Sequence, residues 1–240
     1  MTEDHSGRRY AGAARFGPFF TVDDVRDVSL GWAPVAALAE PTVLMSRVRL
    51  VSAALAAGLP DGYEVPIRVA ASVMQLGLCA RLSAVALGAA VDGLPLPMTT
   101  ELVYVDQLGG PYPLAFVAQG SEHAIRTWPE ALLELVAPIA EATIATFGLS
   151  AQVVWGNVAS GINGAAQMIG ALDLTVNPGL AAVADQLTDL ALSHGRLKGT
   201  MTTGGSTGGQ AVRRRRSCCL IYRLAGSTSA VCGDCVLTAR

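Results

Sequence analysis

Charged side chains and histidines are scarce in this sequence. Charged residues make up only 15% of the 240 residues, whereas hydrophobic residues make up 51%. A chain with so much apolar surface can bury a core, so an intrinsically disordered protein is excluded. The net charge of −2 gives no overall attraction to nucleic acid or to an anionic membrane. His123 and His194 show no metal-ligand spacing to another histidine.

Targeting and membrane signals are also missing. No apolar segment of signal-peptide type follows the N-terminus, so we expect a cytoplasmic protein. The most apolar stretch, Ile67–Val91, is interrupted by Arg68, Gln75 and Arg81, which favours a buried helix over a membrane span. In the cytoplasm, free thiols and metal thiolates are more common than disulfides.

The sequence has no recognisable nucleotide-binding motif. The glycine-rich stretch Gly204–Gly209 lacks the lysine of a P-loop and follows no clear strand. We therefore expect no bound NAD or flavin.

What the sequence does contain predicts an α+β fold, with a mostly helical body and a small antiparallel sheet. The turn and cap residues predict helices at 67–90, from Thr127 to about Phe147, from near Ser150 to Ile169, and from Asn177 to near His194. Residues 21–57 are expected to be helical in pieces, with breaks at Pro34 and Pro41. Residues 101–106 and 114–118 are expected to form a hairpin around Gly109-Gly110-Pro111.

The chain is expected to divide into three parts. Residues 1–198 form the helical body with its hairpin, 199–212 form a flexible loop rich in Gly, Thr and Ser, and 213–240 form a cysteine module. In this module two short β-prone runs flank a Gly/Ser/Thr turn. A hairpin there would bring the pair Cys218–Cys219 next to the pair Cys232–Cys235.

Four thiolates at one place suit zinc, copper(I) or an iron–sulfur cluster. Cys232 and Cys235 have the spacing of a chelating loop. The adjacent pair Cys218–Cys219 is less suited to one small ion, because neighbouring side chains on a strand point to opposite faces. A two-iron cluster is larger, so the pattern favours [2Fe–2S] and leaves zinc open. The fifth cysteine, Cys79, is expected to be buried and inert.

The residues around these cysteines resemble a known family. Residues 215–224 and 232–237 resemble the C-terminal signature of FhuF-type ferric siderophore reductases, and 154–160 (Val-Trp-Gly-Asn-Val-Ala-Ser) resemble a second, shorter motif of that family. Its members are cytoplasmic proteins that hold a [2Fe–2S] cluster on four cysteines and reduce iron bound by hydroxamate-type siderophores. One departure is the spacer 220–231, which is longer than the family's usual one. It falls in a turn, where insertions cost little.

The resemblance implies that Cys218, Cys219, Cys232 and Cys235 are the ligands of a [2Fe–2S] cluster. It implies an enzyme, a siderophore-iron oxidoreductase that transfers one electron to siderophore-bound Fe(III) and releases Fe(II). The partners would be a ferric siderophore and a separate electron donor, such as a ferredoxin or reductase, with no nucleic acid and no membrane span. The alternatives are a zinc-stabilised binding module and a general [2Fe–2S] electron-transfer protein.

Further residues are candidates for binding substrate or supporting the cluster. They are Trp155, Asn157, Arg215, Arg216, Tyr222 and Arg223. The arginines could offset the negative charge of a four-thiolate cluster, although a solvated basic run is the simpler interpretation. Glycines at 156, 161 and 164, inside an expected helix, suggest that another segment approaches closely there.

Overall fold

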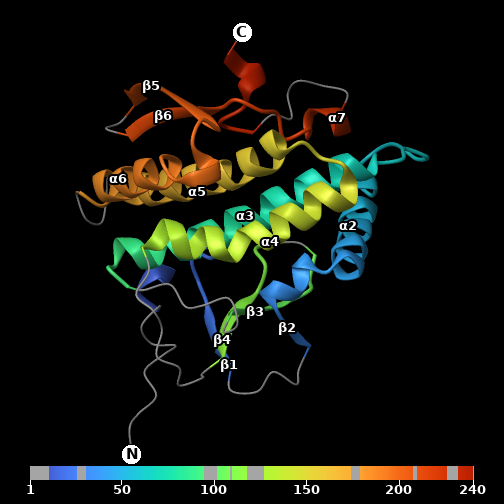
Figure 1. Ribbon diagram of the computed structural model, residues 1–240, viewed down its shortest axis with the longest axis horizontal. Helices are drawn as coiled ribbons and strands as arrows, with labels where there is room; N and C mark the ends of the chain where they lie inside the picture. The colour runs from blue at the N-terminus through green and yellow to red at the C-terminus, as the bar shows by residue number, and fades with distance from the viewer. Residues whose placement is uncertain are drawn as a thin grey trace, which may run out of the picture.

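The computed structural model describes residues 11–25, 31–94, 102–108, 110–117, 127–173, 179–207, 210–225 and 232–239. Of the described residues 62% are helical, and the fold is α+β, as predicted. Figure 1 shows it in layers: a small sheet, then α3 with α4, then α5 with α6, and the C-terminal segment on the outer side of α5 and α6.

The elements follow one another along the chain with these bounds. The helices are α2 (Pro41–Ala56), α3 (Ile67–Val91), α4 (Trp128–Phe147), α5 (Ala151–Asp173), α6 (Leu180–Leu192) and α7 (Tyr222–Ala225). Short 3-10 helices are η1 (Ala11–Phe16), η2 (Val35–Ala39), η3 (Gly195–Leu197) and η4 (Val236–Ala239). The strands are β1 (Asp23–Val25), β2 (Trp32–Pro34), β3 (Leu102–Val105), β4 (Leu114–Val117), β5 (Met201–Thr207) and β6 (Gln210–Arg215).

The larger sheet has the order β1-β4-β3-β2. The predicted hairpin is confirmed, because β3 and β4 pair antiparallel with Val103 opposite Ala115. β2 adds an antiparallel strand next to β3, and β1 pairs parallel with β4. The prediction that 21–57 contains only helical pieces is wrong for β1 and β2, although α2 does begin at Pro41.

The sequence signals at the ends of α4 are confirmed. The backbone N–H of Thr127 donates to the Glu130 carboxylate, with 3.1 Å between nitrogen and oxygen, as in a capping box. The helix ends at Gly148, whose φ of 62° lies in the left-handed region. This turn sends the chain directly into α5.

Helix α3 lies at the centre of the body and packs against α2, α4, α5 and α6. Among the described helices it alone is long and apolar enough to cross a membrane by length and composition, but 78% of its most apolar window is buried in the protein. Its Arg81 side chain is buried and donates to the backbone carbonyls of Tyr112, Phe19 and Thr21. Burial lowers the pKa of Arg81 to about 10.

The C-terminal segment departs from the expected secondary structure. Residues 201–207, predicted as part of a flexible loop, form β5, which pairs antiparallel with β6. The predicted hairpin around the cysteines is not found in the described residues, where Tyr222–Ala225 form α7 and Val236–Ala239 form η4. Residues 226–231, the expected turn, lie outside the described residues.

Candidate metal centre

Strand β6 carries the first three arginines of the run, and Arg216 and Ser217 connect it to the cysteines. Successive side chains of a strand point to opposite faces. Arg213 and Arg215 accordingly point inward and are 2% and 1% exposed, whereas Arg216 is exposed. The run is therefore not a uniformly solvated basic segment.

Arg213 fixes β6 on helix α6. Its guanidinium forms ion pairs with Asp185, at 2.6 Å between Nη1 and Oδ1, and with Asp189, at 2.7 Å between Nη2 and Oδ1. Desolvation lowers the pKa of Arg213, but the two carboxylates together outweigh it, so the pKa is raised. The sequence analysis did not predict these ion pairs. The available signal was the Asp-x-x-x-Asp spacing of α6, which places both carboxylates on one face of the helix.

Among the described residues, Arg215 has no such carboxylate partner. Its Nη2 donates to Asn157 Oδ1 at 2.7 Å, but its buried Nε and Nη1 have no hydrogen-bond partner. Its backbone N–H donates to the carbonyl of Asp234 at 2.9 Å, which ties β6 to the loop between Cys232 and Cys235. A buried cation without a counterion is costly unless an anion is brought near it.

A buried polar network connects Arg215 to the central helix. The amide nitrogen of Asn157, on α5, donates to Gln75 Oε1 at 2.6 Å and to the carbonyl of Ser72 at 3.0 Å. The Ser72 hydroxyl donates to the carbonyl of Cys219 at 2.7 Å. Both α3 and α5 therefore hold the cysteine segment through hydrogen bonds that are shielded from water.

The motif at 154–160 is the surface on which this segment docks. A Cβ atom on Gly156 would lie 2.3 Å from Ser217 Oγ, so only glycine permits this approach. The Ser217 hydroxyl donates to the carbonyl of Gln152 at 2.6 Å, and the Ser160 hydroxyl donates to Asp234 Oδ2 at 2.7 Å. The expected close approach is confirmed at Gly156.

The other two glycines behave differently from each other. A Cβ atom on Gly161 would lie 2.7 Å from the carbonyl oxygen of Cys79, because α3 crosses α5 there. Around Gly164 no atom lies within 4 Å of such a Cβ atom, so the close approach predicted there is not found.

The four C-terminal cysteines belong to the segment that docks on α3 and α5. Cys219 and Cys235 are buried, Cys218 and Cys232 are half-buried, and all four are free. The Sγ atoms of Cys219 and Cys232 are 3.7 Å apart. Across the described residues, no three Cys, His, Asp or Glu side chains are already arranged as a metal-ion site. The structure thus brings one cysteine of each pair together.

The backbone around the cysteines is shaped to support thiolates. The N–H of Leu220 donates to Cys218 Sγ at 3.4 Å, and the N–H of Leu237 donates to Cys235 Sγ at 3.3 Å. Leu220 has a φ of 69°, which among the described non-glycine residues is the single positive value. Hydrogen bonds of this kind stabilise sulfur that carries negative charge.

In the cluster-free protein the pKa shifts differ from one cysteine to the next. The hydrogen bond with Cys232 lowers the pKa of Cys219 to about 6, and the pKa of Cys232 is raised by the same bond. Burial raises the pKa of Cys218. The positive charge of Arg215 lowers the pKa of all three thiols, although it is never the largest cause. Arg215 therefore lies within electrostatic reach of three of the four cysteines.

The residues present fit a [2Fe–2S] cluster. Four thiols supply the soft donors that such a cluster requires, and a four-thiolate [2Fe–2S] cluster is an anion. The buried Arg215 cation, which already acts on Cys218, Cys219 and Cys232, would supply charge complementary to such an anion.

The remaining predicted residues lie on α5 and α7. Trp155 is buried, and the Arg196 guanidinium lies 5.4 Å from its ring centroid. Tyr222 lies on α7, where Arg223 Nε donates to its hydroxyl at 3.3 Å. This hydroxyl raises the pKa of Arg223. Tyr222 was expected on a strand, and that expectation is wrong.

Cys79 is separate from the centre, as predicted. It is 2% exposed within α3, and Gln75 Nε2 donates to its Sγ at 3.0 Å. Desolvation raises the pKa of Cys79 to about 12. A thiol of this kind is an unreactive core residue.

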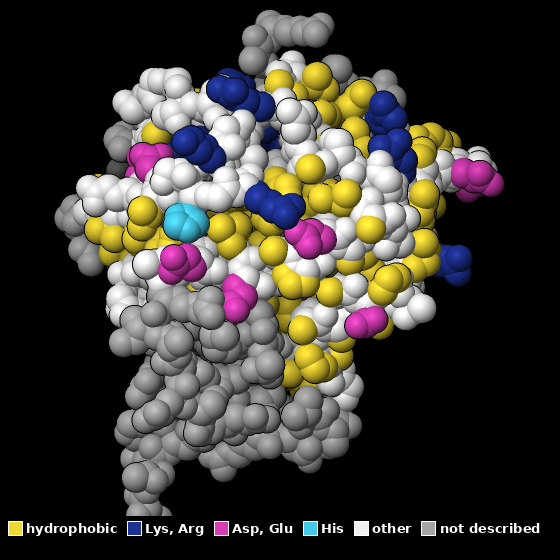
Figure 2. Space-filling model, viewed as in Figure 1, with side chains coloured by type: hydrophobic (Ala, Val, Ile, Leu, Met, Phe, Trp, Pro, Cys, Tyr) yellow, Lys and Arg dark blue, Asp and Glu magenta, His cyan; other side chains and the backbone are white. Residues whose placement is uncertain are grey.

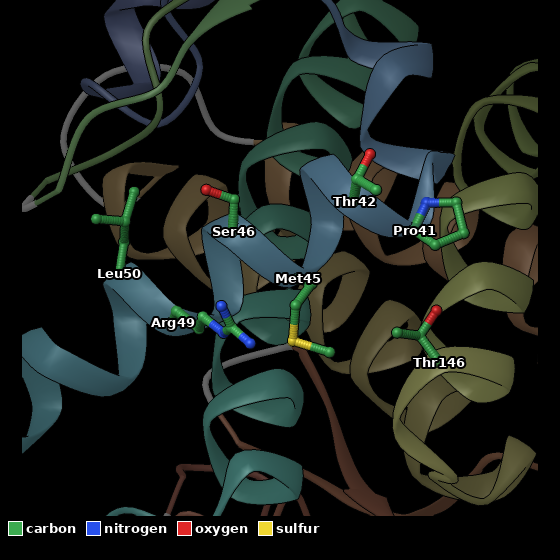
Figure 3. Close-up of a pocket in the computed structure, with 7 residues that line it drawn as sticks. All are labelled: Pro41, Thr42, Met45, Ser46, Arg49, Leu50 and Thr146. Carbon is green, nitrogen blue, oxygen red and sulfur yellow. The ribbon is translucent and has the colours of Figure 1, made fainter.

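A cavity of about 590 Å³ lies away from the cysteines, between α2 and the end of α4. Figure 3 shows Met45, Ser46 and Arg49 on α2, with Thr146 on α4 across from them. Its lining offers no metal ligand and no acid–base pair, so we assign it no chemistry.

Comparison with known proteins identifies the cysteine segment. Residues 215–237, which are 23 of the 240 residues, match the family described as the FhuF 2Fe-2S C-terminal domain. The cysteine segment is therefore of the FhuF type. A search of curated proteins finds no match to the chain. The FhuF match covers Arg215 and all four cysteines, and the cofactor of this FhuF domain is a [2Fe–2S] cluster.

The FhuF match includes only part of the buried polar network around Arg215. The match begins at Arg215 and ends at Leu237, whose N–H donates to Cys235 Sγ. Asn157 and Gly156, which contact Arg215 and Ser217, lie outside the matched segment. The helical body therefore contributes part of the environment of the FhuF domain.

Proposed function

We propose that this protein is a ferric siderophore reductase, which transfers one electron to chelated Fe(III) and so releases Fe(II). The observation that carries the proposal is the FhuF [2Fe–2S] domain, whose cysteines lie over the unpaired buried cation of Arg215. Cys218, Cys219, Cys232 and Cys235 would hold the cluster. When bound, a [2Fe–2S] cluster accepts and donates one electron at a time.

The chain's own residues prepare the centre for this task. Arg215 places a permanent positive charge where negative charge increases on reduction, which favours the reduced state. Asn157 holds the Arg215 guanidinium, and Ser72 holds the backbone of Cys219. Because these contacts come from two long helices, the charge needs little reorganisation when the electron arrives.

Reduction alone is sufficient to release the metal. Siderophores bind Fe(III) through hard oxygen donors, and Fe(II), with less charge, is bound more weakly. The chelate accepts one electron and no covalent bond of the ligand is cut. The electron originates from a separate donor, a ferredoxin or a reductase, since the sequence has no recognisable nucleotide-binding motif. The proposal places the reaction in the cytoplasm, a compartment that keeps free cysteines reduced.

A single-turnover experiment tests the proposal. The anaerobically reduced protein, freed of excess dithionite, is mixed with a ferric hydroxamate while a colorimetric chelator traps Fe(II). We expect one Fe(II) per oxidised chain, and equal rates for the Cys79→Ser variant. A reduced cluster that ferric chelates do not reoxidise, but that an oxidised ferredoxin does, would instead assign a general electron-transfer role.

A further inference from the structure

A second cavity, of about 430 Å³, lies directly beside the cysteine segment. It is formed by the start of α5, by η3 with the residues that follow it, and by the two residues after β6. Its lining includes Gln152, Trp155, Arg196, Lys198, Arg216 and Ser217. Of these, the sequence pointed to Trp155 and Arg216 only.

The cavity is strongly cationic. Three of its side chains, Arg196, Lys198 and Arg216, are basic, and no acidic side chain lines it. Glu141 pairs with Arg196 at 2.9 Å between Oε1 and Nη2, and both side chains are more than half exposed. Figure 2 shows most Lys and Arg side chains of this face in its upper half, above most of the Asp and Glu side chains. The N-terminus of α5 adds the positive end of a helix dipole.

The cavity also adjoins the redox centre. Ser217, in its lining, directly precedes Cys218, and its hydroxyl is bound to the carbonyl of Gln152. Cys218 is half-buried, so this side of the cysteine segment reaches the surface. The cavity between α2 and α4 shares no lining residue with this one.

We propose that this cavity binds the ferric chelate and selects chelates of net negative charge. This inference rests on the proposed reductase function. Three hydroxamates neutralise Fe(III), so a negative chelate carries additional carboxylates or is built from them. Arg196, Lys198 and Arg216 would attract these carboxylates, and Trp155 forms an apolar wall beside them.

The same charges favour the reaction. When bound Fe(III) accepts one electron from the reduced centre, the chelate becomes more negative by one unit. The three cations therefore bind the Fe(II) chelate more tightly than the Fe(III) chelate, which favours electron transfer to the metal.

Binding is measured separately from reduction by using gallium(III), which has the charge of Fe(III) and is not reduced by the protein. Calorimetry on the holoprotein compares anionic gallium dicitrate with neutral gallium tris(acetohydroxamate). In the variant Lys198→Glu/Arg216→Glu we expect Kd for the anionic chelate to rise about tenfold or more, and Kd for the neutral chelate to change less than about twofold. The control is Arg49→Glu, which reverses one charge, half the change of the double variant, at an exposed position in the other cavity.

Other outcomes would overturn the inference. An equal effect of Arg49→Glu would show a general charge effect. Free citrate bound as tightly as gallium dicitrate would show an anion site without preference for a chelate. If the double variant is slower than the wild type only in the rate of reduction by an acidic ferredoxin, the cavity is a docking site for the electron donor. If gallium dicitrate binds as expected but ferric chelates do not reoxidise the protein, the reductase function fails and the binding site stands.

Discussion

Replacing Arg215 by methionine should lower the reduction potential of the cluster. Met keeps much of the buried volume and removes the charge. At an effective dielectric constant of about 20, a unit charge contributes about 2.4 kcal/mol if the separation is taken as about 7 Å. For a one-electron couple, about 1.4 kcal/mol corresponds to about 59 mV, so the expected decrease is about 100 mV. The direction follows because the reduced cluster is the more negative state.

The assay is a redox titration followed by visible absorption and electron paramagnetic resonance. Arg215→Lys keeps the charge, so its midpoint potential should stay within about 30 mV of the wild-type value. A small difference is expected because an ammonium group does not reproduce the geometry of the guanidinium. Asn157→Asp should lower the potential as well, because a carboxylate beside Nη2 of Arg215 cancels its charge. A midpoint potential of Arg215→Met equal to that of the wild type would refute the electrostatic role of this residue.

Two further predictions concern how the cysteine segment docks on α5. Gly156→Ala should destabilise the protein by about 1–3 kcal/mol in thermal unfolding, because its Cβ atom would overlap Ser217 Oγ. The matched control Gly164→Ala has open space and should stabilise the helix by up to about 1 kcal/mol; equal effects of both would argue against the close approach. Ser160→Ala leaves the buried carboxylate of Asp234 without its hydroxyl partner, so iron should be lost to a chelator several-fold faster, and an unchanged rate would contradict this role.

The helices could be predicted because their signals are local. Thr127, Glu130 and Gly148 mark the two ends of α4, and each acts through the backbone within one turn. β1 and β2 could not be predicted in the same way. Each is three residues long, and each is held by pairing with strands about 70 to 90 residues further along the chain.

The glycine-rich residues 201–207 show the same limit. Their composition is typical of a flexible segment, yet pairing with β6 satisfies their backbone groups, and Arg213 fixes β6 on α6. Tyr222 was misplaced for the opposite reason. Its flanking residues are β-prone, but they form the short helix α7.

The candidate site was only partly predictable. The four cysteines stand out by type and spacing, and their assignment as ligands remains a prediction. The inward direction of Arg215 could have been predicted by treating the arginine run as a strand. Alternate side chains of a strand face the same side, so Arg213 and Arg215 would then be buried together. Ser72 and Gln75 gave no signal, since they are ordinary polar residues of an apolar helix far away in sequence.

The central claim is tested most directly by the iron and sulfide content of the anaerobically purified protein, measured together with its visible spectrum. We predict two irons and two sulfides per chain, with charge-transfer bands that bleach on reduction. Cys219→Ser should lose both the bands and the metal, and Cys79→Ser should keep them. A colourless wild-type protein that carries one zinc per chain would contradict the account.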